Sequence, residues 1–193
     1  MFTTIPTIMT WARIFAIPLI VGVFYLPGSM ASDYEKNLAA TVMFVLFALT
    51  DWLDGYLARR LQQSTAFGAF LDPVADKLIV AVALVLLVDE HASLWLTLPA
   101  AVIISREIVV SALREWMAEL GARAQVAVSN VGKWKTAAQM LALVILLAHS
   151  PQFSFWIGLG YGLLSVSAAL TLWSMTQYLR AAWPHLSVTT EKK

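Results

Sequence analysis

The stretch TDWLDGYLARRLQQSTAFGAFLDPVADKL (residues 50–78) contains four aspartates at short, regular intervals. The chain around it is strongly apolar: of its 193 residues, 60% are hydrophobic and only 13% are charged. Soluble domains carry about 25% charged residues, and several apolar runs here reach the roughly 20 residues that cross a bilayer as a helix. We therefore predict an all-α, polytopic membrane protein in which residues 1–193 form a single domain.

Six membrane spans are expected, at about 9–26, 37–58, 74–88, 94–117, 134–148 and 153–179. The N-terminus is interpreted as a retained first span because no small-residue cleavage site follows it. Lysine and arginine are enriched on the cytoplasmic side of membranes. With the N-terminus in the cytoplasm, almost all the basic residues that flank the spans lie on that side, and the opposite connectors hold only Lys36. Both termini and the four aspartates are therefore predicted to be cytoplasmic.

The four aspartates form two pairs with helical spacing. A helix turns by about 100° per residue, so Asp51 and Asp54 project within about 60° of each other, and Asp72 and Asp76 within about 40°. One pair ends the second span and the other begins the third. A hairpin through RRLQQSTAFG is expected to bring the pairs face to face.

Carboxylates beside lipid are costly, at roughly 2.5–3.5 kcal/mol each at bilayer depth, and their mutual repulsion adds to that cost. Two divalent cations would neutralise four carboxylates, and oxygen-only ligation suits Mg²⁺ or Mn²⁺. The chain has no cysteine, which excludes thiolate ligands. The alternative is structural: Asp72 before Pro73 resembles a helix N-cap, and aspartates at an interface can simply be solvated.

Small residues lie beside the aspartates. Gly55 follows Asp51 by one turn and Ala58 follows Asp54 by one turn, which leaves room on the carboxylate face. Gly68 would permit a similarly close approach. Arg59 is suited either to pair with phosphate oxygens or to anchor the helix at the membrane surface.

The complete pattern is D-x2-D-G-x2-A-R-x8-G-x3-D-x3-D. Every fixed place is filled, by Asp51, Asp54, Gly55, Ala58, Arg59, Gly68, Asp72 and Asp76. The pattern resembles the signature of the CDP-alcohol phosphatidyltransferase family. The segments IPTIMTWARI, FGAFLDPVADK, SREIVVSALREWMAELG, GKWKTAAQM and LTLWSMTQYL extend the resemblance over nearly the whole chain.

The resemblance implies six transmembrane helices in a bacterial inner membrane, usually as a homodimer, with an active site that faces the cytosol and no nucleic-acid partner. The donor would be CDP-diacylglycerol, whose lipid-bearing phosphorus is attacked by a hydroxyl group while CMP leaves. In the branch of the family that the chain resembles, the acceptor is sn-glycerol 3-phosphate. The product would be phosphatidylglycerophosphate, which serves the synthesis of anionic phospholipids.

The resemblance also assigns roles to the motif residues. The four aspartates would hold two Mg²⁺ or Mn²⁺ ions, and Asp76 would also be the catalytic base that takes the proton of the acceptor hydroxyl. The residues expected to border CDP-diacylglycerol are Thr10, Arg13, Gly55, Ala58, Arg59 and Gly68. The chain departs from the family at Thr7, where related enzymes often have asparagine, so no nucleotide role is assigned there.

The acceptor phosphate is a dianion and requires fixed positive charge. Arg106 lies about 18 Å along the fourth span, where an arginine should face a polar cavity or a partner. It is expected to bind the acceptor phosphate, with pairing to Glu107 or Glu115 as the alternative. Arg114 follows two turns later. In the segment GKWKT, Lys135 is favoured over Lys133 because it lies deeper in the span.

Three other functions compete with this interpretation. A related transferase would use another acceptor, such as inositol phosphate or phosphatidylglycerol. A membrane prenyltransferase also uses aspartate clusters with Mg²⁺, but those clusters usually lie in separate parts of the chain. A divalent-cation transporter would be expected to show internal repeats and carboxylates at the bilayer midplane, and neither is evident here.

Overall fold

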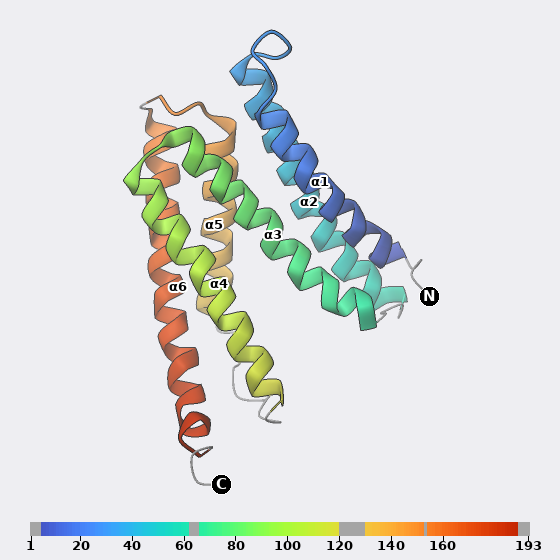
Figure 1. Cartoon of the computed structure of the whole chain (residues 1–193), viewed down its shortest axis with the longest axis vertical. Helices are drawn as coiled ribbons and strands as arrows, with labels where there is room; N and C mark the ends of the chain where they lie inside the picture. The colour runs from blue at the N-terminus through green and yellow to red at the C-terminus, as the bar shows by residue number, and fades with distance from the viewer. Residues whose placement is uncertain (1–4, 62–65, 120–129, 153, 189–193) are drawn as a thin grey trace. The chain divides into compact units, whose positions relative to one another are not determined.

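The structure is a computed structural model of the chain, and it describes residues 5–61, 66–119, 130–152 and 154–188. Within these ranges, side chains are not described for residues 5–9, 51–61, 66, 67, 69, 72, 130–133, 181 and 184–188. The described residues form six helices: α1 (Ile5–Phe24), α2 (Asp33–Leu61), α3 (Ala66–His91), α4 (Leu94–Glu119), α5 (Asn130–Ala148) and α6 (Phe155–Val188) (Figure 1). These ranges contain no β-strand, so the all-α prediction is confirmed for them.

The helices extend beyond the predicted spans. α2 continues to Leu61 and α3 begins at Ala66, so only residues 62–65 separate two helices that were expected to be joined by RRLQQSTAFG. Pro73 lies inside α3, and the alternative in which Asp72 caps the start of this helix is therefore wrong. Hydropathy marks only the part of a helix that suits lipid, whereas alanine, leucine and arginine at the end of α2 favour further helical turns.

The chain divides into two compact units, of which the first contains Met1–His91 and Leu143–Gly158. In this unit α1 packs against both α2 and α3. Figure 1 shows α1 antiparallel to α2 and parallel to α3. Alanines are buried on all three helices, at Ala16, Ala40, Ala75 and Ala83. Small side chains of this kind let helices approach closely, as is typical of membrane proteins.

The connector between α1 and α2 forms hydrogen bonds to the start of α2 and to the end of α3. Ser32 and Glu35 form a capping box at the start of α2: the Ser32 N–H donates to Glu35 Oε2 at 2.8 Å, and the Glu35 N–H donates to Ser32 Oγ at 3.4 Å. This arrangement satisfies two backbone donors that the helix itself leaves unpaired. The Tyr25 hydroxyl donates to Asp89 at 2.7 Å, which joins the connector to the end of α3.

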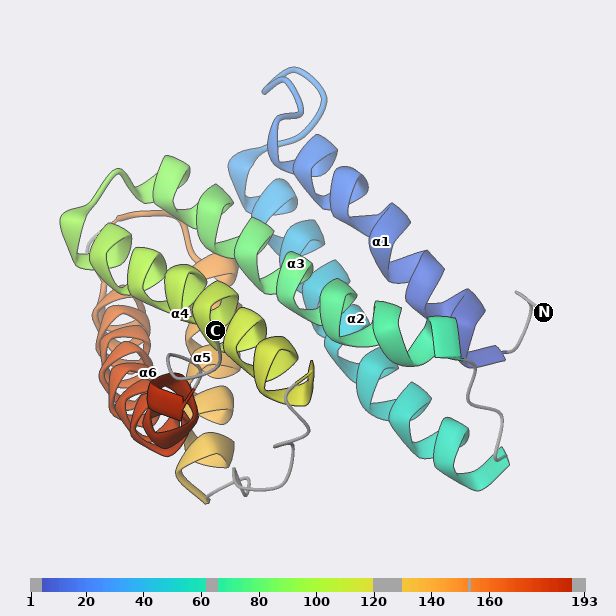
Figure 2. The same cartoon turned by 60° about the horizontal axis from the view of Figure 1, so that its bottom comes forward.

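The second unit contains Ala92–Ala142 and Leu159–Lys193. In the parts of α4, α5 and α6 that belong to it, α4 and α6 run parallel and α5 runs antiparallel to both (Figure 2). The buried residues Leu96, Ile103 and Val110 recur every seven positions along α4, which places them on one helix face. Arg106 follows Ile103 by one turn and is buried on the same face. The sequence thus directs a guanidinium group into the interior of this unit.

Among the described residues, two helices are long and apolar enough to span a membrane. They are Leu94–Glu119, with a mean hydropathy of 1.7 over an 18-residue window, and Phe155–Arg180, with 1.6. Only 28% and 33% of these windows are buried, whereas the core helix of a soluble protein would be mostly buried. Large apolar side chains such as Leu94, Trp95 and Leu98 face outward, as expected for contact with lipid. The number of spans and their orientation stay predictions, as does the single domain.

Candidate functional site

The motif residues lie on the last three turns of α2 and the first three turns of α3. The backbone is helical through both pairs of aspartates, so the predicted angles within each pair, about 60° and 40°, apply. Among the side chains that the structure describes, no three His, Asp or Glu residues gather to hold a metal ion. Because Asp51, Asp54 and Asp72 lie outside that description, as do Gly55, Ala58 and Arg59, the metal site and its surroundings stay predictions.

Asp76 is paired with Arg13. The Arg13 guanidinium donates through Nη1 to Asp76 Oδ1 at 2.6 Å, which connects α1 to α3. The Arg13 side chain is only 1% exposed, whereas that of Asp76 is 42% exposed. Asp76 is therefore held by a buried arginine while its own side chain is partly exposed. The sequence interpretation gave the two residues separate roles and missed their pairing, although a buried arginine in an apolar helix requires an anionic partner.

Two further predicted residues are described near this pair. Thr10 is buried one turn before Arg13 on α1, and residues three apart lie on the same helix face. Gly68 is buried at the start of α3, two turns before Asp76. The close approach expected at Gly68 and the nucleotide contacts expected of both residues stay predictions.

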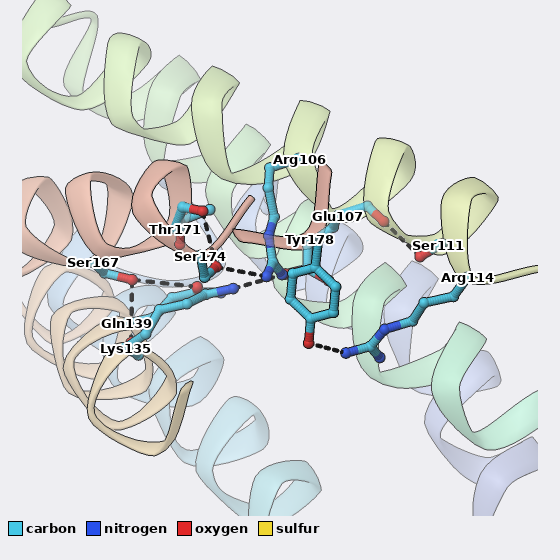
Figure 3. A network of polar contacts seen from close by, with 10 residues as sticks. All are labelled: Arg106, Glu107, Ser111, Arg114, Lys135, Gln139, Ser167, Thr171, Ser174 and Tyr178. Carbon is cyan, nitrogen blue, oxygen red and sulfur yellow. Dashed lines mark hydrogen bonds and ion pairs between the residues drawn. The ribbon is translucent and has the colours of Figure 1, made fainter. Parts of the chain in front are cut away.

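A second group of charged residues lies in the other unit (Figure 3). Glu107 Oε1 accepts a hydrogen bond from Arg106 Nη1 at 2.8 Å and another from Lys135 Nζ at 3.0 Å. Arg106 and Lys135 are 8% and 6% exposed. One carboxylate on α4 therefore joins a buried arginine of the same helix to a buried lysine of α5. We refer to Arg106, Glu107, Arg114 and Lys135 as the basic cluster.

Hydroxyl groups of α6 complete the surroundings of Arg106 and Lys135. Arg106 Nη2 donates to Ser174 Oγ at 2.8 Å, and Ser174 Oγ donates to the Thr171 carbonyl at 3.0 Å. Two turns before Ser174 on α6, Ser167 Oγ donates to the Lys135 carbonyl at 3.2 Å. These bonds join all three helices of the unit and fix the buried cations in position.

Arg114, at the exposed end of the cluster, contacts Tyr178. Its Nη2 donates to the Tyr178 hydroxyl at 2.6 Å, and its guanidinium carbon lies 5.1 Å from the centre of the phenol ring. The same ring centre is 5.7 Å from the guanidinium carbon of Arg106. Figure 3 shows the ring between the two arginine side chains.

The structure brings together Arg106, Arg114 and Lys135, whose predicted role in binding the acceptor stays a prediction. Arg106 pairs with Glu107, which is one of the two partners that the structural alternative named. Lys135 lies within the cluster, and because the Lys133 side chain is not described, the preference for Lys135 stays a prediction. Ser174 and Tyr178 were missed, because no sequence pattern relates them to residues of α4 that precede them by more than 60 positions.

The charge of the basic cluster is unbalanced. The cluster contains three cations and one carboxylate, that of Glu107, which gives a formal excess of two positive charges. A phosphate monoester carries close to two negative charges at neutral pH, since its second pKa is about 6. Arginine also provides several N–H donors in a planar arrangement that matches phosphate oxygens. The cluster is therefore chemically suited to bind a phosphorylated small molecule.

The sequence matches the family model for CDP-alcohol phosphatidyltransferase over residues 3–174. It is 63% identical over 190 residues to the CDP-diacylglycerol–glycerol-3-phosphate 3-phosphatidyltransferase of Pseudomonas fluorescens, which covers 98% of this chain and 95% of the relative. Proteins of the same name from Salmonella choleraesuis and Shigella flexneri are 55% identical over 179 residues, covering 92% of this chain and 94% of each relative. The chain belongs to the CDP-alcohol phosphatidyltransferase family.

Proposed function

We propose that the protein transfers the phosphatidyl group of CDP-diacylglycerol to sn-glycerol 3-phosphate, giving phosphatidylglycerophosphate and CMP. The observation that carries this proposal is the 63% identity, across 98% of the chain, to a relative with that activity in its name. The charge of the basic cluster supports a phosphorylated acceptor over choline or ethanolamine. This reaction would supply a precursor of anionic phospholipids.

The enzyme would be embedded in the bacterial inner membrane as a homodimer. Each of the six helices contains at least 19 residues, close to the roughly 20 that cross a bilayer, which supports six spans. The basic residues at the end of α2 and the start of α5 support a cytosolic site, because lysine and arginine concentrate on that side. A water-soluble acceptor would then reach the lipid donor at the cytosolic surface. The homodimer is supported by the family resemblance alone.

The donor chemistry of the motif fits hard divalent cations. Asp51, Asp54, Asp72 and Asp76 offer only carboxylate oxygens, which Mg²⁺ and Mn²⁺ prefer. Two such ions bound by these residues would offset the negative charge on the reacting phosphates. The exposure of Asp76 supports this assignment, because a side chain that binds a metal ion must be accessible to it.

Asp76 would take the proton of the acceptor hydroxyl as that oxygen bonds to phosphorus. A general base must lie within hydrogen-bonding distance of its proton, and the bond from Arg13 restricts the rotamers that the Asp76 side chain adopts. Arg13 would therefore orient the base from the buried side. Thr10, Arg13, Gly55, Ala58, Arg59 and Gly68 would border the cytidine diphosphate, an assignment that rests on the family motif.

Arg106, Arg114 and Lys135 would bind the phosphate of the acceptor. Two of them are held by Glu107, which keeps these cations in place and reduces their mutual repulsion. A fixed group of cations binds a dianion with little loss of side-chain freedom. The remaining excess of positive charge would favour the dianion over a neutral alcohol.

The proposal is tested by measuring CMP release from purified protein in detergent with Mg²⁺ and CDP-diacylglycerol. Glycerol 3-phosphate, inositol phosphate, serine and phosphatidylglycerol are offered separately. We expect release with glycerol 3-phosphate alone. Release with a different acceptor would retain the phosphatidyl transfer but refute the proposed acceptor, and no release from folded, metal-loaded protein would refute the transferase.

A further inference from the structure

Tyr178 connects the two arginines of the basic cluster. On α4, Arg106 and Arg114 are eight residues apart, which corresponds to about 12 Å along the helix and about 80° around it. Their side chains leave α4 at different levels and in different directions, yet both guanidinium carbons lie within 6 Å of the centre of one phenol ring on α6. The ring is thus the structural element that the two cations share (Figure 3).

The arginines differ in how they are held. Arg106 is buried and bonded to both Glu107 and Ser174. Arg114 is exposed, and in the described part of the chain the Tyr178 hydroxyl is its one hydrogen-bond partner. Exposed arginine side chains lose considerable rotamer freedom when they are ordered. The position of Arg114 therefore depends on Tyr178 far more than that of Arg106 does.

The contact leaves the arginines able to bind an anion. A guanidinium group has five N–H donors, and the Tyr178 hydroxyl accepts from one nitrogen of Arg114. The face of the ring attracts cations, so it offsets part of the repulsion between the two arginines. Tyr178 can therefore keep two like charges close together while most donors of the exposed Arg114 stay available.

We propose that Tyr178 is a positioning residue for the acceptor phosphate: its ring and hydroxyl hold Arg114 and Arg106 in the arrangement that binds the dianion. This inference rests on the proposed function, in which these arginines bind glycerol 3-phosphate. Tyr178 acts through the arginines. Its loss should therefore weaken acceptor binding and leave the chemical step and the binding of CDP-diacylglycerol unchanged.

The test compares Tyr178→Phe and Tyr178→Leu with the unsubstituted protein. Phenylalanine keeps the ring and loses the hydrogen bond, so we expect the KM for glycerol 3-phosphate to rise about threefold. Leucine loses both contacts, and the rise should be about tenfold. In both variants, kcat at saturating acceptor and the KM for CDP-diacylglycerol should stay unchanged. Trp173→Leu removes an exposed ring from the same helix and should change none of these values.

Equilibrium binding of glycerol 3-phosphate, measured by calorimetry on the same proteins, separates this inference from the proposed function. If the unsubstituted protein binds glycerol 3-phosphate without releasing CMP, the proposed reaction fails, and weaker binding by Tyr178→Phe still supports the positioning role. Unchanged KM and unchanged binding in a folded Tyr178→Phe or Tyr178→Leu protein would overturn the inference. So would an equal fall in kcat and in thermal stability without any change in acceptor binding, because that result indicates a structural role alone.

Discussion

The two charged regions of the molecule differ in composition. The end of α2 and the start of α3 contribute four aspartates together with Arg59, Arg60 and Lys77, and Arg13 of α1 pairs with Asp76, whose side chain is 42% exposed. In the basic cluster, three cations outnumber one carboxylate, and two of the cations are buried. Neighbouring carboxylates suit divalent cations, whereas an excess of fixed cations suits a phosphate dianion. On the proposed function, the first region would support the chemical step and the second would select the acceptor.

The largest effect is expected from the carboxylate region. Asp76→Asn removes the proposed base and one metal ligand, so turnover should fall by about 10³-fold or more, while binding of CDP-diacylglycerol stays measurable. CMP release and a direct lipid-binding assay would separate these two properties. Asp89→Asn, at the other end of the same helix, is the matched control and should retain activity. Near-normal turnover in Asp76→Asn would remove Asp76 as the base and weaken the division between the regions.

A smaller and different effect is expected from the basic cluster. Arg106→Ala removes a charged donor from the proposed phosphate site, and the KM for the acceptor should rise about 10- to 100-fold. The KM for CDP-diacylglycerol should change little. Arg180→Ala, which removes an exposed arginine of α6, serves as the control for a general loss of positive charge. An unchanged acceptor KM would exclude Arg106 from the acceptor site.

The smallest effect is expected outside both regions, at the capping box of α2. Ser32→Ala should lower the free energy of unfolding by about 1 kcal/mol without changing either KM. Hydrogen bonds from the Ser32 N–H and hydroxyl lower the pKa of Glu35. This stabilisation is present above the ordinary pKa of glutamate and is lost as the pH falls through the lowered value in the folded state.

Unfolding measured across acidic pH would therefore show the difference between Ser32→Ala and the unsubstituted protein shrinking as the pH falls. Ser29→Ala, in the same connector, should show no such trend. A pH-independent difference would mean that Glu35 does not contribute through this capping box. A change in the KM for the acceptor would show that the connector between α1 and α2 influences the basic cluster, contrary to this prediction.

Local patterns in the sequence predicted the helices and the family to which the chain belongs. Apolar runs located all six helices, and the spacing of Asp51, Asp54, Asp72 and Asp76 identified the family motif. The depth of Arg106 in an apolar helix indicated that it needs a partner, which is Glu107. These inferences succeeded because helical periodicity relates residues that are close in the sequence.

Contacts between distant residues could not be predicted in the same way. Arg13 and Asp76 are 63 positions apart, and Arg114 and Tyr178 are 64 apart. Nothing in either local sequence specifies which helices become neighbours. The end of α2 and the start of α3 were also predicted wrongly: the helices extend beyond the predicted spans. Hydropathy falls where a helix leaves lipid, even though the backbone remains helical.

The ion pair between Arg13 and Asp76 has a consequence for the order in which the protein is made. On the proposed topology, α1 enters the membrane with a guanidinium whose partner is synthesised 63 residues later. At 5–20 residues per second, this delay is about 3–13 s. During that time the arginine, four residues inside the predicted span, would carry part of the roughly 2.5–3.5 kcal/mol that applies at the centre of the bilayer. On that topology, the first helix would reach its final environment only after the third has emerged from the ribosome, and the insertion of the two helices would be mutually dependent.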